Sequence, residues 1–537
     1  MKFPRYEINY NSVFDVAIYI AFAIMISLSI SYKINYHVDE IFTYESSNYV
    51  QENGNFYFFI KDDVEYKPAE NFFLKHIAVQ PEHRFDYSHV WENQARDVHP
   101  PLYYALVHTI CSFYPKEFSP WFAGSINIVF SLLSLYVLRK MSRFFLSDKI
   151  HTNILSVAFI LSAGILSQNT FFRMYIMAMF WVSFLTYLYL KEINMDDKDP
   201  YFFIKVSIVT ICGALTHYYC ILYSVLISII YGIWLLKNRK IKHTCYFCLA
   251  MALSGVISYI IFPAMIKHIF FSYRGKEVLN NASNFLDFFA KIKNMFGIIN
   301  SQLFGGYGNI LLFGFLLFWA FIKFYRKKEG KIKQFETTFK ITEKQLFSYI
   351  LMFVPAVIFF LIISKLTIAI TDRYVFAIFG VFFFSVSMVW IQMISYFSIS
   401  KRLKLLLLIA LFSITTIGTF NRMYWPYLYR NSKEFLSNAK MHPNKNCICF
   451  YNKKWKIQPM FMEARNYRSI KFINVTKKEL FFEQVLKIRD NKIILSFVGV
   501  NADDEKTFLK YLSGHFVEVQ KLGSYGYGSS YVVTKTN

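Results

Sequence analysis

Long apolar segments recur along this chain, separated by shorter stretches that hold most of its charged residues. The first apolar segment, residues 13–32, is long enough to cross the hydrocarbon core of a bilayer as a helix. With ten further segments it predicts about eleven spans, the others being 120–138, 152–170, 172–190, 202–216, 217–236, 245–263, 308–323, 345–364, 372–395 and 404–421. The block 202–236 is too long for one span, so we divide it at Thr216-His217-Tyr218.

Basic residues mark one side of the predicted membrane domain. Lys and Arg gather in short loops between spans, at 139–149, 237–242, 323–344 and 401–404. The positive-inside rule assigns such loops to the cytoplasm, and acidic residues, as in the loop 191–200, carry little weight in it. We therefore expect a multi-pass protein of the cytoplasmic membrane with a cytoplasmic N-terminus and an external C-terminus.

Three longer segments then face outward: the first outer loop at 33–99, a second at 264–307 that ends in a flexible glycine-rich turn, and a polar tail. Short apolar runs in the tail at 447–451, 492–498 and 530–533 predict strands around a helix near 503–513. We therefore divide the chain into a transmembrane domain, 1–422, and a small soluble extracytoplasmic α/β domain, 423–537.

Composition agrees with a membrane protein and argues against nucleic-acid binding. The 537 residues are 55% hydrophobic and 20% aromatic, more apolar surface than a soluble globule of this size could bury. The net charge of +24 lies mostly in the short loops, so we expect no nucleic-acid partner. The seven cysteines are scattered and predict no metal or redox site.

Asp39-Glu40 is the most informative polar feature, because it directly follows the first span. Carboxylates are costly to dehydrate near a membrane, so they tend to persist where they do chemistry. The alternative is an ordinary solvated pair.

Further polar motifs fall at the same predicted outer face. Asp97-Val98-His99-Pro100-Pro101-Leu102-Tyr103-Tyr104 precedes and opens a short amphipathic helix at 101–113. At the outer ends of later spans lie Phe172-Arg173-Met174-Tyr175, Thr216-His217-Tyr218-Tyr219 and Thr371-Asp372-Arg373-Tyr374. Such a set could act on a sugar, since a carboxylate can deprotonate an attacking hydroxyl and cations can stabilise a departing phosphate.

The ordered motifs resemble the protein O-mannosyltransferase superfamily of membrane glycosyltransferases, which have the GT-C fold and include the ArnT-like and RgtA/B/C/D-like enzymes. The resemblance covers residues 1–395, and the Asp97–Tyr104 string is its most specific part. It implies an α-helical multi-pass enzyme that moves a sugar, with inversion, from a polyprenyl-phosphate-linked donor to an acceptor hydroxyl. The acceptor could be a protein, a glycolipid or a cell-wall polymer.

The resemblance also implies roles for individual residues. Asp39 would be the general base, and Glu40 an orienting or acceptor-binding group. Arg173, Arg373 and His217 would bind the donor phosphate. The other substrate-binding residues would be Asp97, His99, Tyr175 and Tyr374. No closed set of metal ligands is visible, although a divalent cation near Asp39 and Glu40 is possible by the same resemblance.

Structural interpretations of these residues stay open. Asp97 could cap the following helix, His99 could bond backbone groups at its start, and His217 could be a satisfied turn residue. Arg173 and Arg373 could extend to the membrane interface. We expect the tyrosine-rich span ends to be aromatic belts and His76, His83 and His89 to be solvated.

Two other functions compete with the glycosyltransferase. A polyprenyl-linked glycan polymerase or ligase usually carries its key residues in a large later outer loop, whereas here the first loop is the informative one. A lipid-linked sugar flippase or transporter tends to place charges at mid-membrane and to show internal repeats. The polar motifs here lie at span ends, and no repeat is evident.

Overall fold

The computed structural model describes residues 10–51, 65–195, 199–283, 287–309, 342–395, 399–422, 426–476 and 478–535. Within these ranges eight helical segments are long and apolar enough to cross a membrane, or nine if one bent pair is counted as a span. They lie in α1 (Tyr10–Ser31), α6 (Pro120–Ser142), α9 (Tyr175–Asn194), α11 (Tyr218–Lys237), α12 (Ile241–Ile261), α18 (Glu343–Leu366), α19 (Phe379–Ser395) with the preceding 3-10 turn η4 (Phe376–Ile378), and α20 (Lys401–Arg422).

Three of the eleven predicted spans differ from this set. Residues 152–170 form the bent pair α7 (Lys149–Ile160) and α8 (Ala163–Thr170), which meet at 54°. The predicted span 202–216 is α10 (Phe202–Thr216), which is apolar but only 15 residues long. The predicted span 308–323 lies almost entirely outside the described residues.

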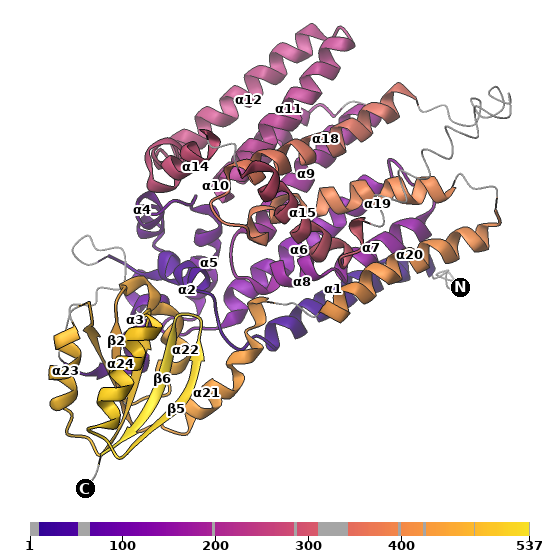
Figure 1. The fold of residues 1–537 in the computed structure, drawn as a ribbon. Coiled ribbons are helices and arrows are strands. Elements are labelled where there is room, and N and C mark those ends of the chain that lie inside the picture. The colour runs from indigo at the N-terminus through magenta and orange to yellow at the C-terminus, as the bar shows by residue number, and fades with distance from the viewer. Residues whose placement is uncertain are drawn as a thin grey trace, which may run out of the picture.

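Burial separates central helices from peripheral ones. In the most apolar stretch of α9 and of the η4–α19 span, 72% of residues are buried inside the protein, whereas the value is 17% for α12 and 22% for α1. Figure 1 shows α12 and α20 at the edges of the bundle. Exposed Ile and Leu side chains on these outer helices suit contact with lipid.

Outside residues 52–64, which are not described, the segment between the first two spans folds into short elements. Its described part contains α2 (Val38–Asn48), β1 (Lys67–Pro68), α3 (Ala69–Ile77), η1 (Pro81–His83), α4 (Ser88–Arg96) and α5 (Leu102–Phe113). The α5 helix matches the predicted amphipathic helix at 101–113, and Pro101 immediately precedes it, where no amide donor is needed.

Short helices also occur in the described part of the segment between α12 and α18. They are α13 (Ala264–Ile266), the π-helical turn η2 (Lys267–Phe271), α14 (Tyr273–Ser283) and α15 (Phe288–Phe304). Gly305 ends α15 with φ 59°, the left-handed conformation that glycine adopts most readily. The turn η3 (Asp372–Tyr374) follows α18 and leads into η4.

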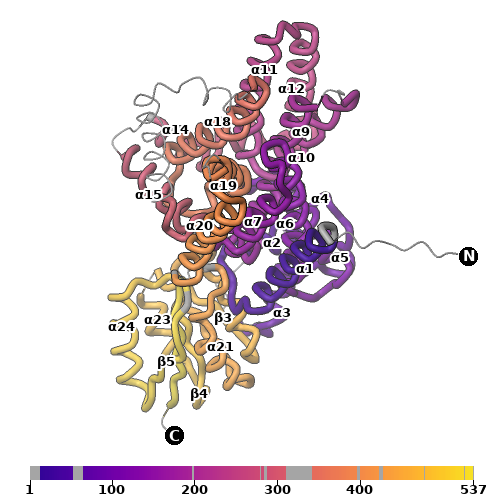
Figure 2. The backbone as a smooth tube through the Cα atoms, turned by 90° about the vertical axis from the view of Figure 1, so that its right-hand side faces the viewer, coloured from indigo at the N-terminus to yellow at the C-terminus, as the bar shows by residue number. Residues whose placement is uncertain are grey.

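A C-terminal module, residues 433–535, packs at one end of the helical bundle (Figures 1 and 2). After η5 (Pro426–Leu428) and η6 (Arg430–Ser432), its elements are α21 (Lys433–Lys440), β2 (Asn446–Tyr451), η7 (Lys454–Lys456), η8 (Gln458–Met460), α22 (Phe461–Ala464), β3 (Ser469–Asn474), α23 (Lys478–Leu486), β4 (Lys492–Val498), α24 (Ala502–Ser513), β5 (Glu518–Tyr525) and β6 (Gly528–Thr534).

These strands, with β1, form a six-stranded sheet of order β1-β3-β2-β4-β6-β5 in the described chain. Strand β2 is parallel to β3 and β4, and the remaining pairs are antiparallel. The predicted strands and helix of the tail coincide with β2, β4, β6 and α24. The prediction did not include β3, β5 or β1, which pairs with the module from the first outer loop.

Each face of the sheet is covered by helices. On one face Ile448, Phe450 and Phe497 pack with Phe481 of α23 and Phe508 of α24. On the other face Cys449, Tyr451 and Phe472 belong to the main core, with residues of α3, α21 and α22. The module is therefore joined to the bundle through the first outer segment.

Candidate active site

Local hydrogen bonds at the start of α2 place Asp39 and Glu40. His37 is the N-cap, and its Nδ1 accepts from the amide of Asp39 at 3.1 Å. Glu40 completes a capping box, because its Oε2 accepts from the amide of His37 at 2.7 Å. The two acidic side chains thus occupy the first turn of a helix, where negative charge is favourable.

Glu40 is wholly buried against a lysine that directly follows the first span. Lys33 Nζ lies 2.9 Å from Glu40 Oε1, and both side chains are 0% exposed. The same ammonium donates to the carbonyl of Thr170 at 2.9 Å and to that of Tyr427. Burial raises the pKa of Glu40, and the Lys33 charge opposes this rise. The Glu40 carboxylate is thus enclosed by internal partners and has no access to solvent.

Asp39, in contrast, keeps 26% of its side chain exposed and pairs with Arg373, of which 24% is exposed. The Arg373 guanidinium donates to Asp39 Oδ2. Burial raises the pKa of Asp39, but the charges of Arg173 and Arg373 outweigh it and hold this pKa at about 2. Asp39 is consequently ionised at neutral pH.

Arg173 links the acidic turn to the Asp97 motif. Its Nη1 donates to the Asp39 carbonyl at 3.1 Å and to Thr43 Oγ1 at 3.2 Å, and its Nη2 donates to His99 Nε2 at 3.2 Å. Since Arg173 can only donate, His99 carries its proton on Nδ1, which lies 2.7 Å from Asp97 Oδ2. Burial raises the pKa of Asp97, but the His99 imidazole and its hydrogen bond bring that pKa below its usual value.

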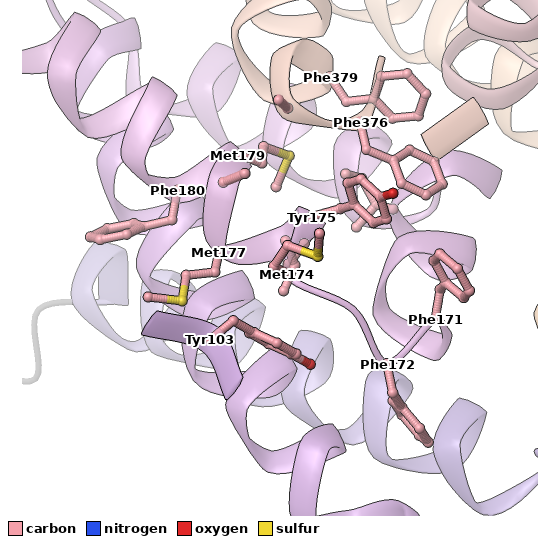
Figure 3. Close-up of a cluster of buried hydrophobic side chains, with 14 of the residues drawn as sticks. Tyr103, Phe171, Phe172, Met174, Tyr175, Met177, Met179, Phe180, Phe376 and Phe379 are labelled. Carbon is pink, nitrogen blue, oxygen red and sulfur yellow. The ribbon is translucent and has the colours of Figure 1, made fainter. Parts of the chain in front are cut away.

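Aromatic side chains border this polar cluster. The Tyr175 ring lies 5.4 Å from the His217 ring and 5.9 Å from the Phe376 ring, and His217 lies 6.4 Å from His99. Figure 3 shows Tyr175 beside Phe376, with Phe171 on the neighbouring segment. Arg373 lies over the Tyr374 ring at 5.9 Å. The nine residues singled out in the sequence therefore gather at one end of the bundle.

The structure also decides several of the open structural interpretations. Asp97 ends α4 and does not cap α5, and His99 bonds side chains rather than backbone. His217 does cap α11, since its Nδ1 accepts from the Tyr219 amide at 3.1 Å. Arg173 is buried rather than extended to the interface, and its Nε has no hydrogen-bond partner among the described residues.

Four residues at the site were missed by the sequence reasoning: Lys33, His37, Asp372 and Tyr427. Lys33 had a signal, because a lysine at the predicted outer end of a span departs from the positive-inside rule. The Tyr427 hydroxyl donates to Asp372 at 2.7 Å, and its ring stacks on Phe171 at 4.1 Å. Tyr427 could not be placed from sequence, since its contacts come from segments far away along the chain.

The residues present do not suit a divalent cation between Asp39 and Glu40. Asp39 pairs with Arg373 and Glu40 with Lys33, so each carboxylate faces a cation. Throughout the described ranges, no group of three or more His, Cys, Asp and Glu side chains could hold a metal ion.

The expectation that His76, His83 and His89 are solvated is wrong for two of them. His76 is buried between Tyr49 and Phe72, and its Nδ1 lies 2.8 Å from the Phe72 carbonyl. His89 is also buried, and its Nε2 lies 3.2 Å from the Ser47 carbonyl. Because the first outer segment folds into packed helices rather than an open loop, these imidazoles find internal partners.

Solved structures match this chain by fold. No family model and no curated protein matches the sequence. Two solved structures of ArnT from Cupriavidus metallidurans match the fold: one bound to undecaprenyl phosphate (TM-score 0.54, 9% identity) and one in the apo state (TM-score 0.52, 10% identity). Each match covers 96% of this chain and 97% of the ArnT chain. The chain therefore has the ArnT-like GT-C fold of a multi-pass membrane protein, as the ordered motifs predicted.

Proposed function

We propose that this protein is a membrane glycosyltransferase that moves a sugar from a polyprenyl-phosphate-linked donor to an acceptor hydroxyl. The observation that carries the proposal is the partly exposed Asp39 carboxylate beside Arg373, with Arg173 behind it. The fold adds support, because one of the ArnT structures that share it is bound to undecaprenyl phosphate.

The reaction is a single displacement at the sugar C1. Asp39 takes the proton of the acceptor hydroxyl as that oxygen attacks C1. The bond between C1 and the phosphate oxygen breaks, and polyprenyl phosphate leaves with the electron pair. Attack opposite the leaving group inverts the configuration at C1.

Arg373 and Arg173 stabilise the departing phosphate. Arginine presents several N–H donors that match phosphate geometry, and the Arg373 side chain is 24% exposed. His99, His217, Tyr175 and Tyr374 border the same space and orient the donor. Asp97 acts through His99, whose Nδ1 it holds.

Arg373 also couples donor binding to the strength of the base. Without donor its charge stabilises the Asp39 carboxylate and makes it a weak base. A donor phosphate competes for the same guanidinium, so Asp39 becomes more basic once the donor is bound. Glu40 and Lys33 keep α2 in place throughout.

The site lies at the end of the bundle that carries the C-terminal module. We assign this end to the external side of the cytoplasmic membrane, with the N-terminus cytoplasmic. In this arrangement residues 1–422 form the catalytic membrane domain and 423–537 an external domain. The acceptor is a protein, a glycolipid or a cell-wall polymer.

The test is glycan and lipid profiling of a deletion strain complemented with variants. The wild-type gene should restore a glycan that the deletion strain lacks, and Asp39→Asn should not, despite normal membrane insertion. Glu82→Gln, an exposed carboxylate in the same outer segment, is the matched control and should restore it. Restoration by Asp39→Asn would exclude Asp39 as the base.

A further inference from the structure

The sheet of the C-terminal module has a strand order that is typical of ligand-binding α/β sheets, and the proposed reaction gives this part of the molecule no role. Strand β2 lies between its parallel neighbours β3 and β4, so the chain turns to opposite sides after β2 and after β4. In open α/β sheets, ligands bind outside the carboxyl ends of the strands where the strand order reverses in this way. Here these ends are Tyr451 of β2 and Val498 of β4.

Polar groups meet at that point. Gly499 follows β4 with φ 69°, and a Cβ there would lie 2.5 Å from Lys456 Cδ and 2.7 Å from Asn452 Oδ1. Only glycine therefore lets these two side chains approach the end of β4. Asn452 Oδ1 is buried, yet it has no hydrogen-bond partner among the described residues.

Two aromatic rings flank the same lysine. Lys456 Nζ lies 5.6 Å from the ring centroids of both Trp455 and Tyr527, and the two rings make an edge contact at 5.3 Å. The Tyr527 carbonyl accepts from the Gly499 amide at 2.6 Å, which fixes the β5–β6 turn beside the end of β4. Trp455 is 38% exposed, so part of its ring is free to stack on a ligand.

This end of the sheet is oriented toward the Asp39 site. The Gln458 side chain, two residues after Lys456, donates to Glu45 of α2 at 3.4 Å. Tyr527 lies within electrostatic range of Asp39 and Arg373: burial raises the pKa of its phenol, the Asp39 carboxylate adds to this, and the Arg373 charge opposes it. A ligand held at Trp455 and Tyr527 would thus lie on the same side as the reacting groups.

We propose that Asn452, Trp455, Lys456, Gly499 and Tyr527 form a subsite that binds an anionic saccharide, the acceptor of the proposed transfer. Aromatic rings stack on the apolar face of a sugar ring, an asparagine amide bonds its hydroxyls, and a lysine ammonium pairs with a phosphate or carboxylate. Lys453 and Lys454 add two further exposed positive charges, and residues 452–457 include no acid. The acceptor assignment rests on the proposed function, but the binding itself does not.

Saturation-transfer NMR on the full-length protein in a sugar-free detergent tests the subsite. The probes are glucose 6-phosphate, glucuronic acid and neutral glucose, which separate phosphate and carboxylate recognition from stacking alone. Wild type should bind both anionic sugars more tightly than glucose. Trp455→Ala should weaken binding of all three by roughly five- to tenfold, whereas Trp455→Phe should keep most of it.

Lys456→Gln should abolish the preference for anionic sugars. The control is Lys510→Gln, which replaces an exposed lysine on α24 and should leave the preference unchanged. Gly499→Ala should weaken the binding of all three probes, because the added methyl group displaces the side chains of Asn452 and Lys456. Melting curves of each variant show whether the module is still folded. Absence of binding by wild type, equal binding of all three sugars, or unchanged binding by a folded Trp455→Ala variant would overturn the subsite.

Asp39→Asn separates this proposal from the preceding one. That variant should bind the probes as wild type does, because the subsite contains no reacting group. If Asp39→Asn still transfers sugar while Trp455→Ala loses probe binding, the proposed mechanism fails and the subsite stands. If Asp39→Asn is inactive but wild type binds no probe, the mechanism stands and the subsite is wrong.

Discussion

Asp39 and Glu40 are neighbours in sequence, but their side chains have opposite surroundings. Glu40 points inward to Lys33 and to two backbone amides, of His37 and Phe172. Asp39 points to the partly exposed Arg373. The helical first turn of α2 produces this division, since successive side chains project about 100° apart around a helix. In the proposed reaction, Asp39 therefore meets the acceptor hydroxyl while Glu40 fixes the position of α2.

The charge of Arg373 should set the pH dependence of the reaction. With its pKa held at about 2, Asp39 stays ionised down to low pH, so kcat/KM should show no loss due to Asp39 between pH 8 and 5. Arg373→Gln removes one cation while Asp39 stays buried, so the pKa of Asp39 rises. The fall of kcat/KM at acidic pH should then begin at a higher pH than in wild type. The check is the pH profile of sugar transfer for wild type, Arg373→Gln and the exposed-site control Arg84→Gln. An acid limb that does not move in Arg373→Gln would contradict the assigned pairing.

Substitutions of Lys33 and Glu40 should have strongly non-additive effects on the free energy of unfolding. Lys33→Met leaves a buried carboxylate without its cation and should cost about 3–5 kcal/mol. The double variant Lys33→Met/Glu40→Gln should lose less stability than the sum of the single variants. Unfolding of the purified protein measures this double-mutant cycle. The exposed pair Arg465–Glu70 is the control, with an expected coupling energy of about 1 kcal/mol or less. If the stability losses of the Lys33 and Glu40 variants simply add, the two side chains do not interact as a buried ion pair.

At the scale of elements, α15 depends on the glycine that ends it. A Cβ on Gly305 would lie 2.2 Å from the Thr415 carbonyl oxygen and 2.8 Å from the Thr419 amide nitrogen, both backbone atoms of α20. The glycine thus permits the close approach of α15 and α20. The approach matters for the site, because Gln302 of α15 donates to Asp372, the neighbour of Arg373.

Gly305→Ala should therefore lower stability by about 1–3 kcal/mol, since it combines a positive φ with a backbone clash. Gly297, in the same helix, provides the matched control because a Cβ there meets nothing within 4 Å. Gly297→Ala should raise stability slightly, by about 0.5–1 kcal/mol, as alanine does inside helices. Thermal unfolding of both variants is the measurement, and equal effects of the two substitutions would refute the packing argument.

At the scale of the whole molecule, the first outer segment joins the membrane bundle to the module. Strand β1 pairs with β3, and Phe72 of α3 lies 5.0 Å from Phe472. Phe73 is fully buried and contacts Phe461. Asn48 of α2 donates to the Ile77 carbonyl of α3 at 2.7 Å, so the helix that carries Asp39 packs on the helix that contacts the module.

Phe73→Ala should remove about 3–5 kcal/mol of packing at this junction and expose the module to cleavage. Limited proteolysis should then release C-terminal fragments much faster than from wild type. Phe85→Ala, at a ring that is 40% exposed, is the control and should behave like wild type. Unchanged proteolysis of Phe73→Ala would show that this contact does not hold the module.

Most membrane helices could be predicted from the sequence, because the length of an apolar segment and the turn residues beside it are local properties of the chain. The sequence also predicted β2, β4 and β6. It did not predict β3 or β5, in which polar residues interrupt the apolar ones, nor β1, which is defined only by its partner in the module. Lys33 and Tyr427 were missed for a related reason. Their roles depend on contacts between segments that lie up to 394 residues apart.

We propose Asp39 as the base of a lipid-linked sugar transfer. The most direct measurement follows a radiolabelled sugar from a polyprenyl-phosphate-linked donor into membranes of the deletion strain, using purified wild type, Asp39→Asn and Glu82→Gln. We expect Asp39→Asn to be slower by a factor of about 10²–10⁴, as for loss of a general base, with donor binding retained and Glu82→Gln fully active. Transfer by Asp39→Asn at close to the wild-type rate would show that Asp39 is not the base.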